Sequence, residues 1–138
     1  MLHIKKVKPL FNSLITTGDK FEKDQRENGL ITAKKGDLKL WQKVVAVGSV
    51  VRDIEVGDMV MINPYNYAVR KYDKNSLQND MDTNPTIKYQ FNWVVMDDEN
   101  GHPKDYLLLN DRDIQYVIEG EEVEDVIIMP NKSKLLVN

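Results

Sequence analysis

The residues of this chain that could carry chemistry begin with its two histidines, His3 and His102. His3 lies near the N-terminus and His102 follows a turn signal, Asn100-Gly101, so the sequence does not bring them together. The 138 residues include no cysteine, which removes a thiolate nucleophile, a thiolate metal ligand and a disulfide. A zinc site is therefore not expected, and both histidines are interpreted as solvated side chains.

Two acidic stretches have residue types that occur in metal or catalytic sites. Residues 80–84, Asp-Met-Asp-Thr-Asn, match the first half of a calcium loop, but its sixth position is Pro85 rather than glycine and its twelfth is Phe91 rather than glutamate. Residues 97–99 are adjacent acids beside Asn100-Gly101, which is typical of an exposed turn rather than of an acid and base pair. The sequence also has no glycine-rich phosphate loop. It predicts a protein that is not an enzyme, with no metal and no cofactor.

The overall composition narrows the class further. A net charge of −3 argues against a nucleic-acid binder held by phosphate contacts, and a basic patch at Lys5, Lys6 and Lys8 is interpreted as solvated. No apolar run approaches the roughly 18 residues of a membrane span. The start, residues 1–9, lacks the apolar core of a signal peptide, and the absence of cysteine fits a reducing compartment. The expectation is one cytoplasmic domain over residues 1–138.

One apolar island stands inside a hydrophilic segment. Residues 17–28 are almost entirely polar or charged, then Gly29-Leu30-Ile31-Thr32 follows, and residues 34–37 are polar again. Asn28-Gly29 is a strong turn signal, which favours a surface hairpin over residues 21–33 with Leu30 and Ile31 packed inward. However, the partner strand over residues 22–27 offers no apolar side chain to pair with them. The alternative interpretation of this segment is a loop that binds a partner.

The elements that would position this loop are short strands. The runs Val44–Val47 and Met59–Ile62 are β-branched or apolar, too short for helices, and bounded by Gly48 and Gly57, to which we assign the turns. Further strands are expected over residues 11–16, 38–41, 67–72, 87–95, 106–109 and 114–118. The pattern of these strands predicts an all-β fold, a small antiparallel barrel.

The clearest periodicity is the alternation of apolar residues between Ile87 and Val95. Five apolar positions alternate with more polar ones, which predicts a single strand with one buried and one solvated face. Five aromatic residues within and before this stretch would be stacking platforms in a single-strand-binding barrel, but the acidic balance favours packing in a core or an interface. These aromatic residues are Tyr65, Tyr67, Tyr72, Tyr89 and Trp93.

In this order the pieces resemble the chaperonin-10 family, the co-chaperonins that cap a large ATP-driven folding ring. The resemblance lies in Lys8-Pro9-Leu10, in Gly29-Leu30-Ile31 within a charged loop, and in Ala46-Val47-Gly48 followed by Val56–Val60. It continues through Asn63–Val69, Leu107–Leu109 and Asp113-Ile114. It covers most of residues 7–72 and 105–119.

The resemblance implies a GroES-like β-barrel with a mobile loop over residues 17–37. To this barrel the chain adds an extra β-hairpin, an insertion over 73–98 and a C-terminal extension over 120–138. It implies a heptameric ring that binds a GroEL-like chaperonin through Gly29, Leu30, Ile31 and Thr32, without nucleic acid or membrane. The short segment 49–55 leaves no room for the family's roof hairpin. Such shortened roofs are similar to those of the co-chaperonins that bacteriophages encode for capsid folding.

A second class of protein stays open. Thr32 stands where the family usually has a third apolar residue, and the family has nothing similar to residues 73–98 or to the tail. These departures favour a phage structural or assembly protein, a virion component that uses the same barrel for subunit contacts. Burying Leu30 and Ile31 would contribute about 1.5–3 kcal/mol each. Ordering ten loop residues costs more, at roughly 1–2 kcal/mol per residue. Binding therefore requires several loops acting together.

Overall fold

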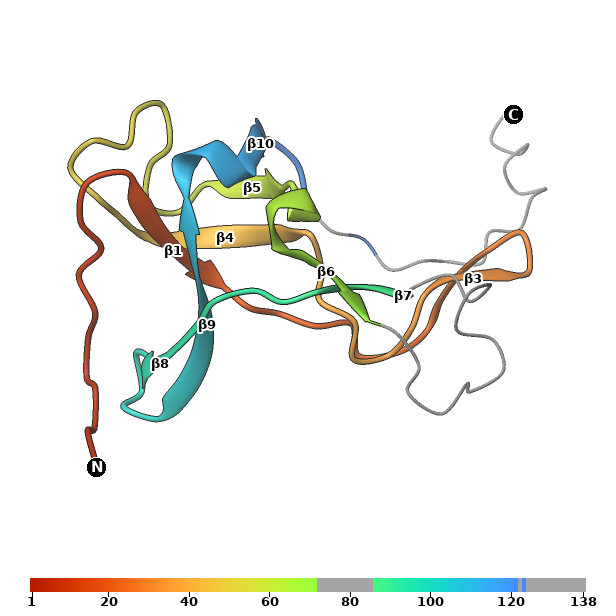
Figure 1. Ribbon diagram of the computed structural model, residues 1–138, viewed down its shortest axis with the longest axis horizontal. Helices are drawn as coiled ribbons and strands as arrows, with labels where there is room; N and C mark the ends of the chain where they lie inside the picture. Colours follow the sequence, from red (N-terminus) through yellow and green to blue (C-terminus); the bar gives the residue numbers. More distant parts are fainter. Residues whose placement is uncertain (72–85, 122, 124–138) are drawn as a thin grey trace. The chain divides into compact units, whose positions relative to one another are not determined.

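The computed structural model describes residues 1–71, 86–121 and 123, and it confirms the all-β class (Figure 1). The chain divides into two compact units. The first contains Met1–Asp19 and Lys39–Ile118, and the second contains Lys20–Leu38 with the segment that begins at Glu119. Residues 73–85 of the predicted insertion and most of the C-terminal extension lie outside the described residues.

The described strands are short and all their pairings are antiparallel. They are β1 (Ser13–Thr17), β2 (Gln25–Glu27), β3 (Leu30–Ala33), β4 (Trp41–Val47), β5 (Met59–Ile62), β6 (Ala68–Lys71), β7 (Thr86–Tyr89), β8 (Trp93–Asp97), β9 (Pro103–Asn110) and β10 (Ile114–Ile118). Two 3₁₀ turns, η1 (Pro64–Tyr67) and η3 (Asp111–Asp113), precede β6 and β10. The strands predicted at Val44–Val47 and Met59–Ile62 are present, the first of them as part of β4.

Six strands of the first unit form one sheet in the order β10-β5-β4-β1-β9-β8. The strands β1 and β9 pair over five positions from Ser13 opposite Asn110 to Thr17 opposite Tyr106. A register shift between Ile15 and Thr16 marks a bulge against β4. Among the described strands no closed barrel is found, because β10 and β8 end the order without pairing to each other. This open sheet takes the place of the expected barrel.

The main core lies on one face of this sheet. The registers place Thr16 beside Val44 and Leu107, and Gln42 beside Val60, so alternate positions of neighbouring strands share the face. Its fully buried apolar members are Leu14, Val44, Val60, Ile62, Leu107 and Leu109. A smaller cluster of Ile15, Met96 and Tyr106 is covered in part by Ile4 and Val7 of the N-terminal segment. Burying both faces of β1 makes it the centre of the unit.

The single strand predicted over residues 87–95 is wrong. Thr86–Tyr89 pairs with β6 and Trp93–Asp97 pairs with β9. Residues 90–92 between them belong to neither strand. The break is held by Gln90, whose N–H donates to the Tyr67 carbonyl, and by Asn92, whose carbonyl accepts from Leu108 N. In β8 the buried side chain is Met96, whereas Trp93 and Val95 are 40% and 50% exposed. The apolar alternation therefore does not mark the buried face.

The two glycines that bound the central strands act differently. Gly57 has φ +99°, as a turn glycine should. Gly48 instead lies against the chain at Phe11, where an added Cβ would come within 2.3 Å of the Phe11 carbonyl oxygen. The constraint on Gly48 is this close backbone approach, which its predicted role in a turn does not explain.

Candidate binding site

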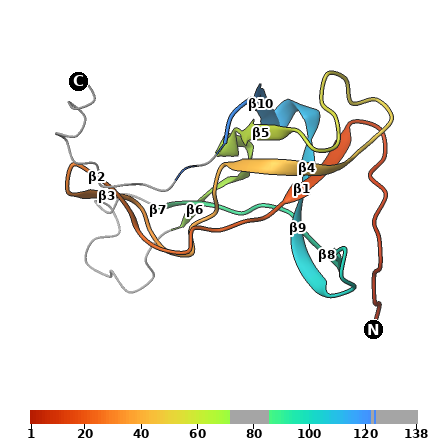
Figure 2. The ribbon, with the colours of Figure 1, turned by 180° about the vertical axis from the view of Figure 1, so that it is seen from behind.

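The apolar island forms the end of a hairpin in the second unit. Strands β2 and β3 pair antiparallel, with Glu27 opposite Leu30 and Arg26 opposite Ile31. Asn28 and Gly29 both have positive φ, 57° and 83°, which is the geometry of a type I′ turn. The hairpin predicted from Asn-Gly is thus present (Figures 1 and 2).

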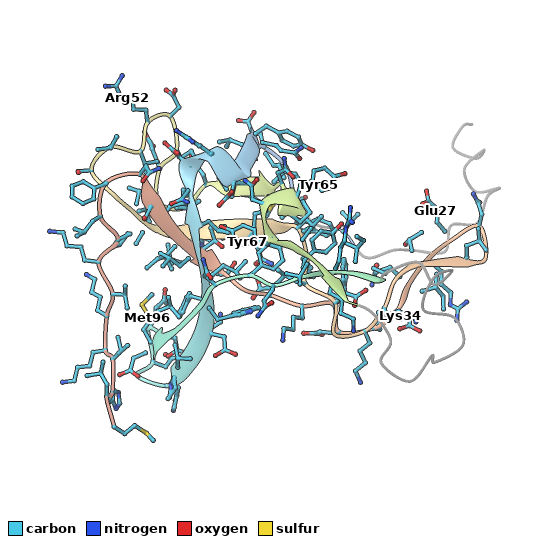
Figure 3. All side chains as sticks on the ribbon, viewed as in Figure 1. Glu27, Lys34, Arg52, Tyr65, Tyr67 and Met96 are labelled. Carbon is cyan, nitrogen blue, oxygen red and sulfur yellow. The ribbon has the colours of Figure 1, made fainter. Side chains whose placement is uncertain are left out.

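The two apolar side chains of this hairpin face solvent. Leu30 is 71% exposed and Ile31 is 43% exposed, so the expectation that they pack inward is wrong. Their cross-strand partners, Glu27 and Arg26, are charged and supply no apolar surface against which they could be buried. Figure 3 labels Glu27 on this hairpin. The arrangement leaves an adjacent leucine and isoleucine in water beside a tight turn.

Thr32, the third residue of the predicted motif, serves the hairpin itself. Its side-chain hydroxyl donates to the Gln25 carbonyl at 3.3 Å, across the strand pair. Gly29 meets no atom within 4 Å of a built Cβ, so its role is the turn conformation rather than a close contact. Of the four residues in the predicted site, Leu30 and Ile31 are those that offer apolar surface to a partner.

The base of the hairpin is closed by backbone and carboxylate contacts within the same unit. Phe21 N donates to the Asp37 carbonyl at 2.9 Å, and Gly36 N donates to the Phe21 carbonyl at 2.8 Å. Lys34 N and Lys35 N donate to the side chains of Asp37 and Asp24 at 2.9 and 2.8 Å. Charged residues of this segment therefore make specific contacts at the base of the hairpin, with a turn at Lys35 and Gly36.

In the first unit, the side chain of Gln42 forms hydrogen bonds to Asp19 and Lys39, the two residues that flank segment 20–38. This side chain is 2% exposed and makes four hydrogen bonds. Its amide nitrogen donates to the carbonyls of Asp19 and Lys39 at 2.9 and 2.7 Å. Its amide oxygen accepts from Asp19 N at 2.9 Å and from the Thr17 hydroxyl at 2.8 Å. Every donor and acceptor of one buried amide is thus used to hold the two ends of the insertion together.

Gln42 was missed by the sequence analysis, although a signal was available. Gln42 and Val44 are two residues apart in a strand and therefore share its inward face. A glutamine on that face must have its polar atoms satisfied by the protein.

A second buried polar group is the carboxylate of Asp113, in the 3₁₀ turn η3. It is 2% exposed and accepts from the Tyr67 hydroxyl, from Asn66 Nδ2 at 2.8 Å and from Asn110 N at 3.0 Å. The Tyr67 ring, labelled in Figure 3, also packs on the Phe91 ring, and the two ring centroids are 4.9 Å apart. Burial, reinforced by the carboxylate, raises the pKa of Tyr67 well above its ordinary value. The phenol is a fixed donor, so this cluster is structural.

The other candidate groups are placed as separate contacts. His3 Nε2 lies 3.1 Å from both carboxylate oxygens of Asp97. The Asp98 carboxylate accepts from Asn100 N and His102 N, and the His102 bond contributes most to lowering the pKa of Asp98. Within residues 1–71, 86–121 and 123, no group of three histidines or acids is placed to hold a metal ion.

No protein-family model matches the chain, and no curated protein matches it at a significant level. The part of the chain that the structure describes contains no helix long and apolar enough to cross a membrane. The assignment of the β2–β3 hairpin as a candidate binding site therefore depends on the geometry of the hairpin.

Proposed function

We propose that this protein is a co-chaperonin-like ring protein that caps a chaperonin through Leu30 and Ile31 of the β2–β3 hairpin and so assists protein folding, with capsid proteins as candidate clients. The observation that carries the proposal is the exposure of these two adjacent side chains, 71% and 43%, beside a tight turn. In this role the protein has no active site, and nucleotide chemistry belongs to the partner.

The hairpin changes the energetics of such binding. A loop without structure would lose backbone entropy at roughly 1–2 kcal/mol per residue on docking. Here the Asn28-Gly29 turn and the β2–β3 ladder already restrict the backbone, which reduces the ordering cost that binding must overcome. One hairpin is still a weak ligand, because it offers only two apolar side chains to a partner. An isolated two-stranded hairpin is also only marginally stable. Several copies acting together raise the affinity.

A phage structural or assembly protein is the second candidate. It is favoured by Thr32, whose hydroxyl is bonded within the hairpin rather than offering apolar surface to a partner. In that case the same hairpin contacts other subunits of an assembly, and no chaperonin is bound.

A pull-down with a bacterial chaperonin in the presence of ATP separates the two. The proposal predicts that the wild-type protein is retained and that Leu30→Asp is lost. Val56→Asp is a matched control, because Val56 is also apolar and 62% exposed but lies in the turn before β5. Retention of Leu30→Asp at the wild-type level, or no retention of the wild type, would reject the capping role.

A further inference from the structure

The β6–β7 hairpin is basic in a chain that is acidic overall. Its strands, Ala68–Lys71 and Thr86–Tyr89, contain Arg70, Lys71 and Lys88 and no aspartate or glutamate. The whole chain has a net charge of −3. The hairpin therefore differs in charge from the rest of the chain, and the kind of partner that it attracts is an anionic one.

The strand β7 has an apolar face and a basic face. Successive side chains of a strand point to opposite faces, so Ile87 and Tyr89 share one face and Lys88 lies on the other. Ile87 is 48% exposed and Tyr89 is 45% exposed, and Lys88 is exposed as well. Their partners across the hairpin, Arg70 opposite Ile87 and Ala68 opposite Tyr89, are charged or small and leave the apolar face open.

The outer edge of β7 is available to a further strand. Among the described strands β7 pairs with β6 alone, and Figure 1 shows the two side by side. An extended peptide binds such an edge through backbone hydrogen bonds, and the side chains on the two faces select its sequence. Like charges opposite each other destabilise a strand pair, so Lys88 disfavours pairing between two copies of β7 and favours an acidic strand.

The base of the hairpin is fixed within the first unit. Directly after β7, Gln90 N donates to the Tyr67 carbonyl at 2.8 Å, and the Phe91 ring centroid lies 4.9 Å from that of Tyr67. The Tyr67 hydroxyl donates to the buried carboxylate of Asp113. The base of β7 is therefore ordered before a partner binds, which lowers the entropy cost of binding.

We infer that β7 binds an extended acidic polypeptide as an added strand, with acidic side chains beside Lys88 and apolar side chains beside Ile87 and Tyr89. The partner segment therefore alternates acidic and apolar residues. Single-stranded nucleic acid is disfavoured, because it uses neither the backbone edge of β7 nor the apolar surface of Ile87. The site shares no residue with the β2–β3 hairpin and its test uses no chaperonin, so this inference and the capping role can fail separately.

The test is the binding of a labelled peptide, Glu-Val-Glu-Val-Glu-Val-Glu, to the full chain, measured by fluorescence anisotropy at low salt. We expect saturable binding that weakens as salt is added, because exposed charges are screened. Lys88→Glu should weaken the binding by about tenfold, since repulsion replaces attraction across the strand pair. Lys6→Glu is the matched control, because Lys6 is also exposed but lies in the N-terminal segment.

A peptide of opposite charge separates lost pairing from lost folding. Lys88→Glu should bind Lys-Val-Lys-Val-Lys-Val-Lys more tightly than the wild type does, which a misfolded variant would not do. The inference is overturned if the wild type does not bind the acidic peptide, or if Lys6→Glu weakens binding as much as Lys88→Glu. It is also overturned if the wild type binds single-stranded oligothymidylate and not the peptide.

Methylation of the peptide backbone distinguishes an added strand from simple attraction between charges, and it needs no variant of the protein. Alternate N–H groups of a strand point to the same edge, so the glutamate nitrogens and the valine nitrogens of the peptide face opposite edges. Methylating the set that faces β7 should abolish binding, whereas methylating the other set should leave it unchanged. Equal effects of the two methylations would show that no strand is added.

Discussion

At the scale of single residues, Gln42 is the buried side chain that connects the two ends of segment 20–38. Its four hydrogen bonds connect Thr17, Asp19 and Lys39, all close to the point where the segment leaves and re-enters the sheet. A buried amide of this kind both stabilises the fold and specifies which backbone groups meet.

Replacing Gln42 with alanine should therefore destabilise the protein strongly. The substitution leaves buried carbonyls and an N–H without partners, each costing about 1–3 kcal/mol. We expect the free energy of unfolding, measured with urea, to fall by at least about 2 kcal/mol. Gln25→Ala is the control, since the side-chain amide of Gln25 donates a hydrogen bond to the carbonyl of the nearby Lys23 at 3.0 Å, outside the core. Equal effects from the two substitutions would contradict the role given to Gln42.

The hydrogen bond between Tyr67 and Asp113 predicts a loss of stability at alkaline pH. The pKa of Tyr67 is raised in the folded protein above its ordinary 10.0. A tyrosine in the unfolded chain loses its proton first as the pH rises, so the stabilisation is complete below pH 10 and decreases above it. Tyr106, whose pKa is also raised by burial, adds to this trend.

The corresponding variant is Tyr67→Phe. At neutral pH it should lose about 1.5–3 kcal/mol, the contribution of a hydrogen bond to a charged group. Above pH 10 it should lose less stability with rising pH than the wild type, because one of the two shifted tyrosines is gone. Urea denaturation at neutral and alkaline pH measures both effects. An unchanged pH dependence in Tyr67→Phe would show that the phenol is not the group responsible.

At the scale of elements, the close approach of Gly48 to Phe11 joins the start of β1 to the end of β4. Gly48 N donates to the Ser13 carbonyl at 2.8 Å, and Val50 N donates to the Phe11 carbonyl at 2.9 Å. Phe11 itself has φ 58°, an unusual conformation for a bulky residue.

A methyl group at Gly48 should not fit. Gly48→Ala places a Cβ 2.3 Å from the Phe11 carbonyl oxygen, a backbone atom that cannot move without shifting β1. We expect a loss of about 1–3 kcal/mol, as for an overpacked core. Gly120→Ala is the control, because no atom lies within 4 Å of its built Cβ. Thermal unfolding of the two variants compares them, and similar midpoints would argue against the close approach.

The sequence predicts elements well where the local signals agree. Glycine, β-branched runs and Asn-Gly place β4, β5, the β2–β3 turn and the β8–β9 turn without knowledge of the tertiary structure. It fails between Ile87 and Val95, where a regular alternation spans two strands of different sheets. Periodicity reports which side chains share a side, but tertiary packing decides which side is covered.

The candidate site shows the same division between local and tertiary information. The turn at Asn28-Gly29 follows from two residues, whereas the exposure of Leu30 depends on what packs over the hairpin. Glu27 and Arg26 across the strand pair explain why nothing apolar covers it within the hairpin. For Gln42 and Asp113 the sequence does not identify the partners, because most of them come from distant positions that only the fold brings together.

At the scale of the whole molecule, capping by weak hairpins requires assembly. The protein diluted until it is monomeric has an intact hairpin but no neighbouring copies. We expect the monomer to bind the chaperonin at least about 100-fold more weakly than the multimer, because the gain from linked contacts is lost. Binding measured by surface-immobilised chaperonin with ATP tests this. A monomer that binds as tightly as the multimer would show that avidity is not needed.

The central proposal, that Leu30 and Ile31 form the surface that binds a chaperonin, is tested most directly by hydrogen exchange on the complex. With ATP and a bacterial chaperonin present, the amides around residues 29–33 should exchange more slowly than in the protein alone, while those of the Gly57 turn should be unchanged. A complex that protects other segments and leaves this hairpin exchanging freely would contradict the claim.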